Sequence, residues 1–540
     1  MSIKKLKKGL LARAHKQQLR HSSSTDFQKL IELSIRYAKE GDFKKEEDCY
    51  RKLLKISPDD SDVLNHLGNA LGSQYRLSEA LACYEQALIR NPKDIGTHAN
   101  IGDKLVRVGR VDEAILHYKK FLTSSTNEYI LYSSYLFALN YLPTKPEDFF
   151  YAEAKKWWEI FGNHFFGRRF SHNQRQKNTG RIRIGYVSPD FRRHSVSYFF
   201  LPTIKNHDRT LFHVYCYSDV ATPDDITEEI KAHAETWRPV FTVPDEDLMQ
   251  KIYEDRIDIL IDLAGHTGHN RLPVFARKPA PIQVSWLGYP NTTGLESIDY
   301  RFTDDIADPP GTSDDNHTET LVRLPHGFLC YSPPQSPPTE KKNRADSNTI
   351  SFGSFNNLSK INEETVTLWS EILAKVPNSL LIMKANALRD NQTRVRYKDM
   401  FRQKGISEER IKMRPSTSTT EEHLGMYREI DIALDTHPYN GTTTTCEALW
   451  MDTPVITLYG NRHASRVGGS ILSRIGYNEL ICHSKEQYVA KAVQLATEAR
   501  QTLEYYRNTR ERMIQSELCN PKQFCQQLES AYKKMLDTIH

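Results

Sequence analysis

The sequence predicts a short array of helical repeats followed by two α/β lobes, each built on a parallel sheet. Three observations predict this fold class. A 34-residue spacing of prolines and apolar residues marks the N-terminal part, and β-rich runs alternate with amphipathic helices from residue 181 onward. A segment rich in Pro, Ser and Lys then divides the α/β region in two. At 540 residues the chain is too long for a single ordinary core.

The composition is that of an ordinary globular chain. Lys and Arg number 73 against 68 Asp and Glu, a net charge of +5, and 39% of the residues are hydrophobic. This balance gives no indication of a nucleic-acid partner and defines no oligomeric state. There is no apolar run of the roughly 18 residues that a transmembrane helix needs. The eight cysteines form no C-x-x-C pair, which argues against a disulfide framework and favours a reducing, cytoplasmic compartment.

Residues 1–26 are expected to form a basic leader, in which seven Lys and Arg precede the first acidic residue, Asp26. Such charge runs are usually solvated, so we expect a solvated and partly unfolded segment. A transit peptide or a helix on a membrane surface remains the alternative, because Leu6, Leu10 and Leu11 lie between the charges.

Residues 27–142 are expected to hold about three tetratricopeptide (TPR) repeats. Pro58 and Pro92 are 34 residues apart, which is the TPR period. Four positions of the first copy recur in the second in this register: Leu30, Leu33, Tyr37 and Tyr50 correspond to Leu64, Leu67, Leu71 and Tyr84. A third copy around residues 101–118 lacks the closing proline. Three repeats are about the minimum for a stacked core, and we expect their concave face to bind an extended peptide or a partner helix.

Residues 143–180 are expected to be a helical linker that leads into the first lobe, residues 181–331. Its β-rich runs are 181–188, 212–218, 257–263 and 281–287. A linker at 332–348 precedes the second lobe, residues 349–500, with runs at 349–355, 379–383, 411–414, 430–434 and 454–458. We expect C-terminal helices in residues 501–540 to close over this body. Two such lobes leave a cleft at the carboxyl ends of their strands, where α/β folds bind ligands.

The strongest chemical signal is the segment 439–450, which lies between two strands of the second lobe. Asn440-Gly441 favours a tight turn, and four threonines, 442–445, then open a helix. A helix N-terminus with free amides and hydroxyls binds anions, so this one is suited to a pyrophosphate. Glu447, one turn inside the helix, is placed to hold a ribose diol. A plain cap needs one such residue rather than four.

Two loops at strand ends supply candidate catalytic groups. His194 follows the first strand of the first lobe, at the edge of the sheet where catalytic groups collect. This turn lacks G-x-G-x-x-G, which disfavours a dehydrogenase. Lys360 follows the first strand of the second lobe and is suited to neutralise a diphosphate leaving group.

Loops after two further strands of the first lobe contain candidates for lining the cleft: His266, Thr267, Tyr289 and Pro290. His266 and His269 have an H-x-x-H spacing without a clear third ligand, which is weak evidence for a metal. The sequence therefore favours chemistry without a metal.

Together these motifs resemble the TPR-linked protein O-glycosyltransferases, the family that includes O-GlcNAc transferase and plant SPINDLY. The resemblance covers residues 181–540 and the repeats before them, and it rests on 185–194, 277–290, 352–360 and 439–450. It implies a GT-B-type pair of Rossmann-like lobes, inversion at the anomeric carbon, no metal or other cofactor, and acceptor proteins bound along the TPR groove.

The resemblance also implies roles for individual residues. His194 matches the family's active-site histidine, and Lys360 matches the lysine that neutralises the diphosphate. Thr443 and Thr444 match the threonines that hold the pyrophosphate, and Glu447 matches the carboxylate that binds the ribose.

Three further donor-binding positions bear on the choice of sugar nucleotide. Thr442 and Asn357 stand where animal O-GlcNAc transferases have His and Gln, and both look like SPINDLY, which uses GDP-fucose. Arg466 looks like the O-GlcNAc transferases, which use UDP-GlcNAc. The smaller Thr442 and Asn357 leave more room for a bicyclic guanine. We therefore expect GDP-fucose as the donor, with UDP-GlcNAc as the second candidate.

The sequence thus predicts a metal-independent inverting glycosyltransferase that moves a sugar from a nucleotide donor to serine or threonine hydroxyls of proteins. Two alternatives stay open. One is a non-catalytic TPR scaffold, and the other is a glycosyltransferase that acts on small-molecule or glycan acceptors.

Overall fold

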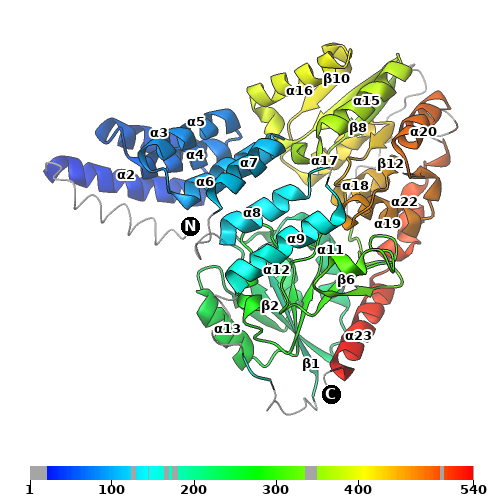
Figure 1. Ribbon diagram of the computed structural model, residues 1–540, viewed down its shortest axis with the longest axis horizontal. Helices are drawn as coiled ribbons and strands as arrows, with labels where there is room; N and C mark the ends of the chain where they lie inside the picture. The colour runs from blue at the N-terminus through cyan, green and yellow to red at the C-terminus, as the bar shows by residue number, and fades with distance from the viewer. Residues whose placement is uncertain are drawn as a thin grey trace.

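A computed structural model describes residues 21–122, 129–143, 145–162, 170–172, 180–334, 349–498, 501 and 504–538 of the chain. The expectations for residues 1–20 and for nearly all of the 332–348 linker lie outside these residues. Figure 1 shows a helical array that projects from two α/β lobes. The predicted fold class is confirmed.

The helical array consists of antiparallel pairs: α2 (His21–Glu40), α3 (Phe43–Ile56), α4 (Ser61–Ser73), α5 (Leu77–Arg90), α6 (Ile95–Arg107) and α7 (Val111–Phe121). Side chains of Asp60 and Asp94 accept hydrogen bonds from backbone amides in the first turns of α4 and α6. Glycine allows each pair to approach closely, because a methyl group at Gly68 or Gly102 would overlap a tyrosine ring of the next helix. The 34-residue pattern of the sequence therefore reflects the packing of helix pairs.

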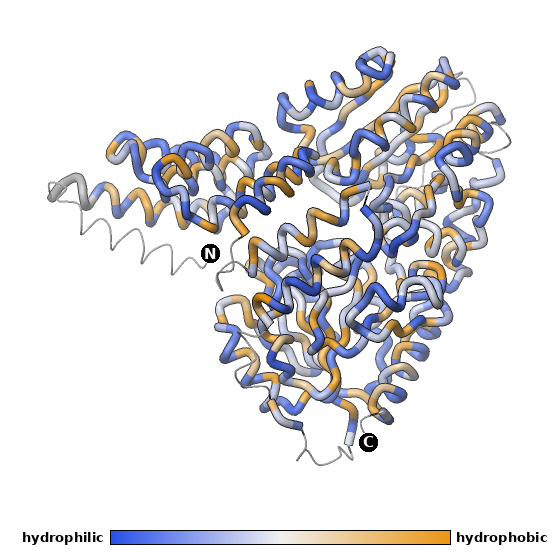
Figure 2. The backbone as a smooth tube through the Cα atoms, viewed as in Figure 1, coloured by the Kyte–Doolittle hydropathy of each residue, from blue (hydrophilic) through white to orange (hydrophobic). Residues whose placement is uncertain are grey.

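Two more helices join the array to the first lobe: α8 (Tyr129–Leu139) and α9 (Glu147–Trp157), the latter continued by a π-helical turn, Trp158–Gly162. Trp157 is completely buried. Among the described helices, none is long and apolar enough to cross a membrane. Figure 2 shows hydrophilic and hydrophobic residues interspersed along the helices of the array.

The first lobe contains a parallel sheet of order β3-β2-β1-β4-β5-β6-β7. Its strands are β1 (Ile182–Ser188), β2 (Phe212–Ser218), β3 (Thr236–Pro239), β4 (Ile259–Asp262), β5 (Ile282–Ser285), β6 (Tyr300–Thr303) and β7 (Thr320–Arg323). The associated helices are α11 (Ser195–Asn206), α12 (Asp225–His233), α13 (Asp245–Glu254) and α14 (Leu272–Ala276). The strand order reverses between β1 and β4, so the loop after β1 opens at a switch point, where such sheets bind ligands.

The second lobe contains a parallel sheet of order β10-β9-β8-β11-β12-β13. Its strands are β8 (Ile350–Ser354), β9 (Ser379–Lys384), β10 (Ile411–Arg414), β11 (Ile432–Leu434), β12 (Val455–Leu458) and β13 (Ile481–Cys482). Its helices are α15 (Glu363–Lys375), α16 (Asn391–Gln403), α17 (Thr420–Gly425), α18 (Thr443–Trp450), α19 (Val467–Arg474) and α20 (Lys485–Thr497). Here the order reverses between β8 and β11, whose following loops carry the motifs singled out in the sequence.

The last helices, α22 (Thr509–Ile514) and α23 (Pro521–Asp537), cross back to the first lobe. Figure 1 shows α23 lying along that lobe, far from the second sheet. The hydroxyl groups of Tyr532 and Tyr186 are 3.0 Å apart, and Glu529 accepts a hydrogen bond from His207. The first lobe is therefore completed by residues from the far end of the sequence.

Candidate functional site

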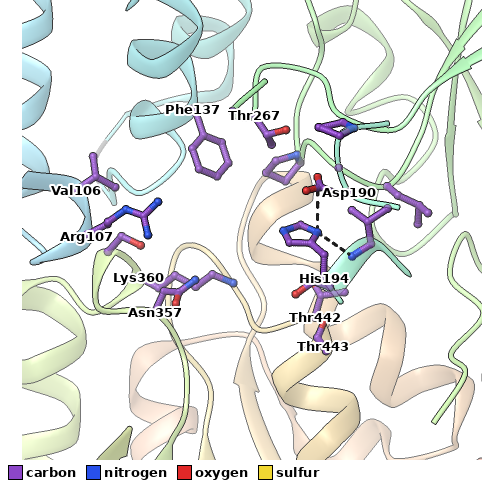
Figure 3. Close-up of a pocket in the computed structure, with 18 of the residues that line it drawn as sticks. Val106, Arg107, Phe137, Asp190, His194, Thr267, Asn357, Lys360, Thr442 and Thr443 are labelled. Atoms are coloured by element: carbon purple, nitrogen blue, oxygen red, sulfur yellow. Dashed lines mark hydrogen bonds and ion pairs between the residues drawn. The ribbon is translucent and has the colours of Figure 1, made fainter. Parts of the chain in front are cut away.

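A cleft of about 1190 Å³ lies where the helical array and both lobes meet. Figure 3 shows Arg107 and Phe137 of the helical region, His194 of the first lobe, and Lys360 and Thr442 of the second lobe around this space. The loops that follow β1 and β8 both line this cleft, so the switch points of the two sheets form one site.

The N-terminus of α18 forms one wall of the cleft. Asp435 fixes the preceding turn, because its carboxylate accepts a 2.6 Å hydrogen bond from the amide of Gly441. The first amides of a helix have no acceptor within it, and Thr442 at the N-cap position makes no side-chain cap. The hydroxyl of Thr443 is buried and, among the described residues, has no hydrogen-bond partner. This wall is therefore suited to an anion.

Lys360 ends a short helical turn after β8 and lies beside the same wall. Its Nζ donates a 2.7 Å hydrogen bond to the backbone oxygen of Asn440 and lies 4.0 Å from the ring centroid of Tyr439. Burial lowers the pKa of Lys360 to about 8, although the carboxylate of Asp435 opposes the shift. An ammonium group next to a helix N-terminus makes this part of the cleft strongly electropositive.

His194 caps the N-terminus of α11 on the opposite side. Its Nδ1 accepts a 3.3 Å hydrogen bond from the amide of Val196 and lies 3.6 Å from a carboxylate oxygen of Asp190 (Figure 3). Burial lowers the pKa of His194, and Asp190 partly offsets this effect. Because Nδ1 accepts a hydrogen, the neutral ring carries its proton on Nε2, which makes Nε2 a hydrogen-bond donor.

Glu447 lies one turn inside α18 and belongs to a network that sequence reasoning missed. Its carboxylate accepts hydrogen bonds from Nε2 of His423, at 2.8 Å, and from the hydroxyl of Tyr427, at 3.4 Å. Nδ1 of His423 is in contact with Nζ of Lys384 at the end of β9. Burial lowers the pKa of Lys384 to about 8, although Glu447 opposes the shift. The network orients Glu447, which lines the cleft.

The remaining candidate residues divide into two groups. The first group lines the cleft and comprises Asn357, Thr442, Thr444, His266, Thr267 and Pro290. Tyr289 and Arg466 do not line it. Tyr289 is buried against α8, where its hydroxyl lies 3.2 Å from Asn140. The guanidinium of Arg466 donates to Gly460 and to Ser313. Its role at the donor therefore stays a prediction.

His266 is only 1% exposed, and both of its ring nitrogens have partners inside the protein. Nδ1 lies 2.9 Å from the hydroxyl of Ser133, and Nε2 lies 2.7 Å from the backbone oxygen of Thr293. The histidine therefore ties α8 to the first lobe and has no nitrogen left for a metal. Among the described residues, no three or more His, Cys, Asp and Glu side chains are arranged to hold a metal ion.

The helical array contributes a wall that no sequence motif indicated. Asp103, Val106 and Arg107 of α6 and Phe137 of α8 line the cleft. The guanidinium of Arg107 is paired with the carboxylate of Asp103 at 2.9 Å. These side chains are ordinary helix-surface residues in the sequence, and only the packing of the third repeat onto the lobes brings them to the site.

Comparison with known proteins places the chain among glycosyltransferases. It matches the model of Glycosyl transferase family 41 over residues 163–333 and 338–528, and a tetratricopeptide repeat model over residues 37–60. A solved structure described as a mutant O-GlcNAc transferase of Thermobaculum terrenum superposes with a TM-score of 0.87 at 32% identity. The match covers 96% of this chain and 98% of that one.

Two plant relatives carry the name probable UDP-N-acetylglucosamine–peptide N-acetylglucosaminyltransferase. SPINDLY of Petunia hybrida is 39% identical over 406 residues, which is 74% of this chain and 43% of the relative. SEC of Arabidopsis thaliana is 32% identical over 376 residues, which is 67% of this chain and 38% of the relative. The chain thus spans less than half the length of these curated relatives.

Proposed function

Since the chain belongs to glycosyl transferase family 41, we propose that it transfers a sugar from a nucleotide-sugar donor to serine or threonine hydroxyls of proteins. The observation that carries this proposal is the pairing of Lys360 with the N-terminus of α18 through Asn440. A lysine and a row of helix amides on one wall suit the diphosphate of a sugar nucleotide. The names of the plant and Thermobaculum terrenum relatives support a protein acceptor.

The reaction is a direct displacement at the anomeric carbon by the acceptor hydroxyl, without a metal. Negative charge grows on the departing diphosphate, and Lys360 with the amides at Thr443 and Thr444 stabilises it. Groups held in place before the reaction act where charge develops, and this lowers the barrier. His194, with its proton on Nε2, orients the substrates as a hydrogen-bond donor. In this tautomer it is not set to take the acceptor proton, which favours the donor phosphate as the base.

The acceptor is a protein segment that enters along the helical array. Val106, Arg107 and Phe137 lie on the cleft wall that the array supplies, so a chain following the repeats reaches the reaction site. A transferase for small molecules has no need of such a wall. A cytoplasmic location fits the eight free thiols.

The donor is GDP-fucose in the first instance and UDP-GlcNAc in the second. Thr442 and Asn357 both line the cleft, and their side chains are smaller than the His and Gln of animal O-GlcNAc transferases. A hydrogen-bonding pocket of a given size discriminates between bases steeply, because the wrong base leaves buried polar groups unpaired.

The test is transfer from radiolabelled GDP-fucose and UDP-GlcNAc to protein and peptide acceptors, in EDTA, by the full-length chain. Incorporation into protein that resists EDTA is the expected result. Binding of nucleotide sugars without any transfer would favour the scaffold alternative. Transfer to a small acceptor but to no protein would favour the glycan or small-molecule alternative. Restoration of a lost activity by a divalent metal would refute the metal-independent mechanism.

A further inference from the structure

His463 occupies a place in the cleft that no sequence motif indicated. It begins a short helical turn, His463–Ser465, just before α19, and it lines the cleft although it is only 4% exposed. The amide of Asn440 donates a 2.8 Å hydrogen bond to the backbone oxygen of Ala464. Since Lys360 donates to the oxygen of the same Asn440, His463 lies next to the electropositive wall.

The ring of His463 is held by Asp308, from the loop after β6 of the opposite lobe. Nδ1 lies 2.7 Å from a carboxylate oxygen of Asp308, which is completely buried. Burial alone would raise the pKa of Asp308, yet His463, His317 and Arg301 together hold it well below its usual range. The carboxylate is therefore ionised and acts only as an acceptor, so Nδ1 of His463 carries the hydrogen, and in the neutral ring Nε2 presents a lone pair.

The Nε2 atom of His463 differs from that of two other histidines paired with carboxylates, His207 and His423. In the buried pair of His207 and Glu529, Nε2 of the histidine lies 2.8 Å from the hydroxyl of Tyr186. Both ring nitrogens of His423 are likewise in contact with other side chains. Nε2 of His463 has no hydrogen-bond partner within the described part of the chain. His463 lines the cleft, so a substrate bound there can supply the missing partner of this atom.

Resting on the proposed transferase function, we propose that Nε2 of His463 accepts a hydrogen bond from a substrate hydroxyl, and that Asp308 is the positioning residue that fixes the required tautomer. The cleft then contains two histidines of opposite character. His194 has its Nδ1 occupied by a backbone amide and donates through Nε2, whereas His463 has its Nδ1 hydrogen on Asp308 and accepts through Nε2.

The hydroxyl belongs either to the donor sugar or to the serine or threonine of the acceptor. In the first case His463 recognises the donor sugar through this hydrogen bond. In the second case the acceptor oxygen bonds to the anomeric carbon, the bond from sugar to phosphate breaks, and its electron pair leaves with the diphosphate. The acceptor proton then passes to Nε2 of His463, which replaces the donor phosphate as the base, and the imidazolium is stabilised by Asp308.

The test compares H463F, D308N and the double variant H463F/D308N in the full-length chain. The double variant removes the buried charge that H463F leaves unpaired, so it keeps the comparison valid if H463F alone misfolds. H207F is the matched control, because it deprives another buried carboxylate, Glu529, of its histidine outside the cleft. Melting temperatures show which variants fold.

If the hydroxyl is that of the sugar, H463F weakens binding of the nucleotide sugar about 10-fold and leaves binding of the nucleoside diphosphate unchanged. If it is that of the acceptor, both affinities stay unchanged and kcat falls about 100-fold. H207F changes neither quantity. Binding and kcat of H463F or the double variant within twofold of wild type would overturn the proposal.

D308N tests whether Asp308 fixes the tautomer of the His463 ring. An amide in place of the carboxylate can donate to Nδ1 and so favours the other tautomer. Nitrogen NMR of ¹⁵N-labelled histidine is expected to show the hydrogen of His463 on Nδ1 in the wild type and on Nε2 in D308N. An unchanged tautomer together with unchanged kinetics would remove Asp308 from the site. A wild-type protein inactive with every nucleotide sugar would instead refute the transferase function, which this NMR measurement does not depend on.

Discussion

The ammonium group of Lys360 lies 2.7 Å from the backbone oxygen of Asn440 and so ties the loop after β8 to the turn that begins α18. The two elements are 80 residues apart in the sequence, yet together they form the electropositive wall of the cleft. Charge on this wall, rather than its shape alone, is expected to govern the rate of transfer.

Replacing Lys360 with Ala is expected to lower kcat by about 100- to 1,000-fold, because one preorganised electrostatic donor is lost from the developing charge. The melting temperature should change little, since burying an ammonium group contributes little to folding. K375A is the matched control, because that lysine is exposed on α15 and pairs with Glu371. Near-wild-type kcat for K360A would exclude Lys360 from the mechanism.

The activity is expected to fall as the pH rises through about 8. Burial lowers the pKa of Lys360 in the free enzyme to about 8, so its positive charge is present below that pH and is lost above it. A profile of kcat/KM against pH measures this effect. The pKa of Lys384 is also lowered to about 8, so variants are needed to separate the titration of Lys360 from that of Lys384.

K360R should move the alkaline limb upward, because arginine keeps its charge. K384R should leave the limb in place if Lys360 is responsible. If K384R instead moves the alkaline limb of the pH profile, the titrating group belongs to the network around Glu447.

Combining T442H with N357Q is expected to shift nucleotide preference from GDP toward UDP by about 10-fold or more. The larger side chains reduce the space for a bicyclic base in the part of the cleft that both residues line. Calorimetric titration with GDP and UDP measures the ratio of affinities. Tighter binding of UDP by the unaltered protein would overturn the GDP assignment and leave the transferase function in place.

Replacing Gly102 with Ala is expected to destabilise the third repeat by about 1 to 3 kcal/mol, because the added methyl group would overlap the ring of Tyr118. Gly96 of the same helix is the matched control. A methyl group there would come no closer than 3.7 Å to another atom, so G96A should be neutral or slightly stabilising. Equal melting temperatures for G102A and G96A would contradict the close packing of α6 on α7.

Several β-rich runs of the sequence predicted their strands well. Residues 212–218 and 411–414 form β2 and β10 with the expected bounds, because β-branched, aromatic and other apolar residues end there at clear turn signals. The strands β3, β6 and β7 of the first lobe and the two-residue β13 of the second lobe were missed. The strands β3, β6 and β7 each have four residues and contain an arginine, as the predicted β10 also does, so the pattern of so short a segment does not separate a strand from a loop. They form strands because they pair with neighbouring strands of the sheet.

Some residues of the cleft were likewise predicted from the sequence and others were missed. Residues of a contiguous motif, such as Thr443 and Glu447, were predicted because the helix start that presents them is local in sequence. Arg107 and His463 were not, because each reaches the cleft only through contacts between distant segments. No spacing rule links Asp308 with His463, which are 155 residues apart.

The return of α23 to the first lobe has a consequence for synthesis. Residues of this helix, including Tyr532 and Glu529, supply partners for Tyr186 and His207 in that lobe. The ribosome therefore releases most of the first lobe long before its last packing partner exists, whereas the second lobe has all its strands by residue 482. The lobe that is made first is completed last, so a nascent chain exposes the apolar surface under α23 until residues 521–537 have emerged.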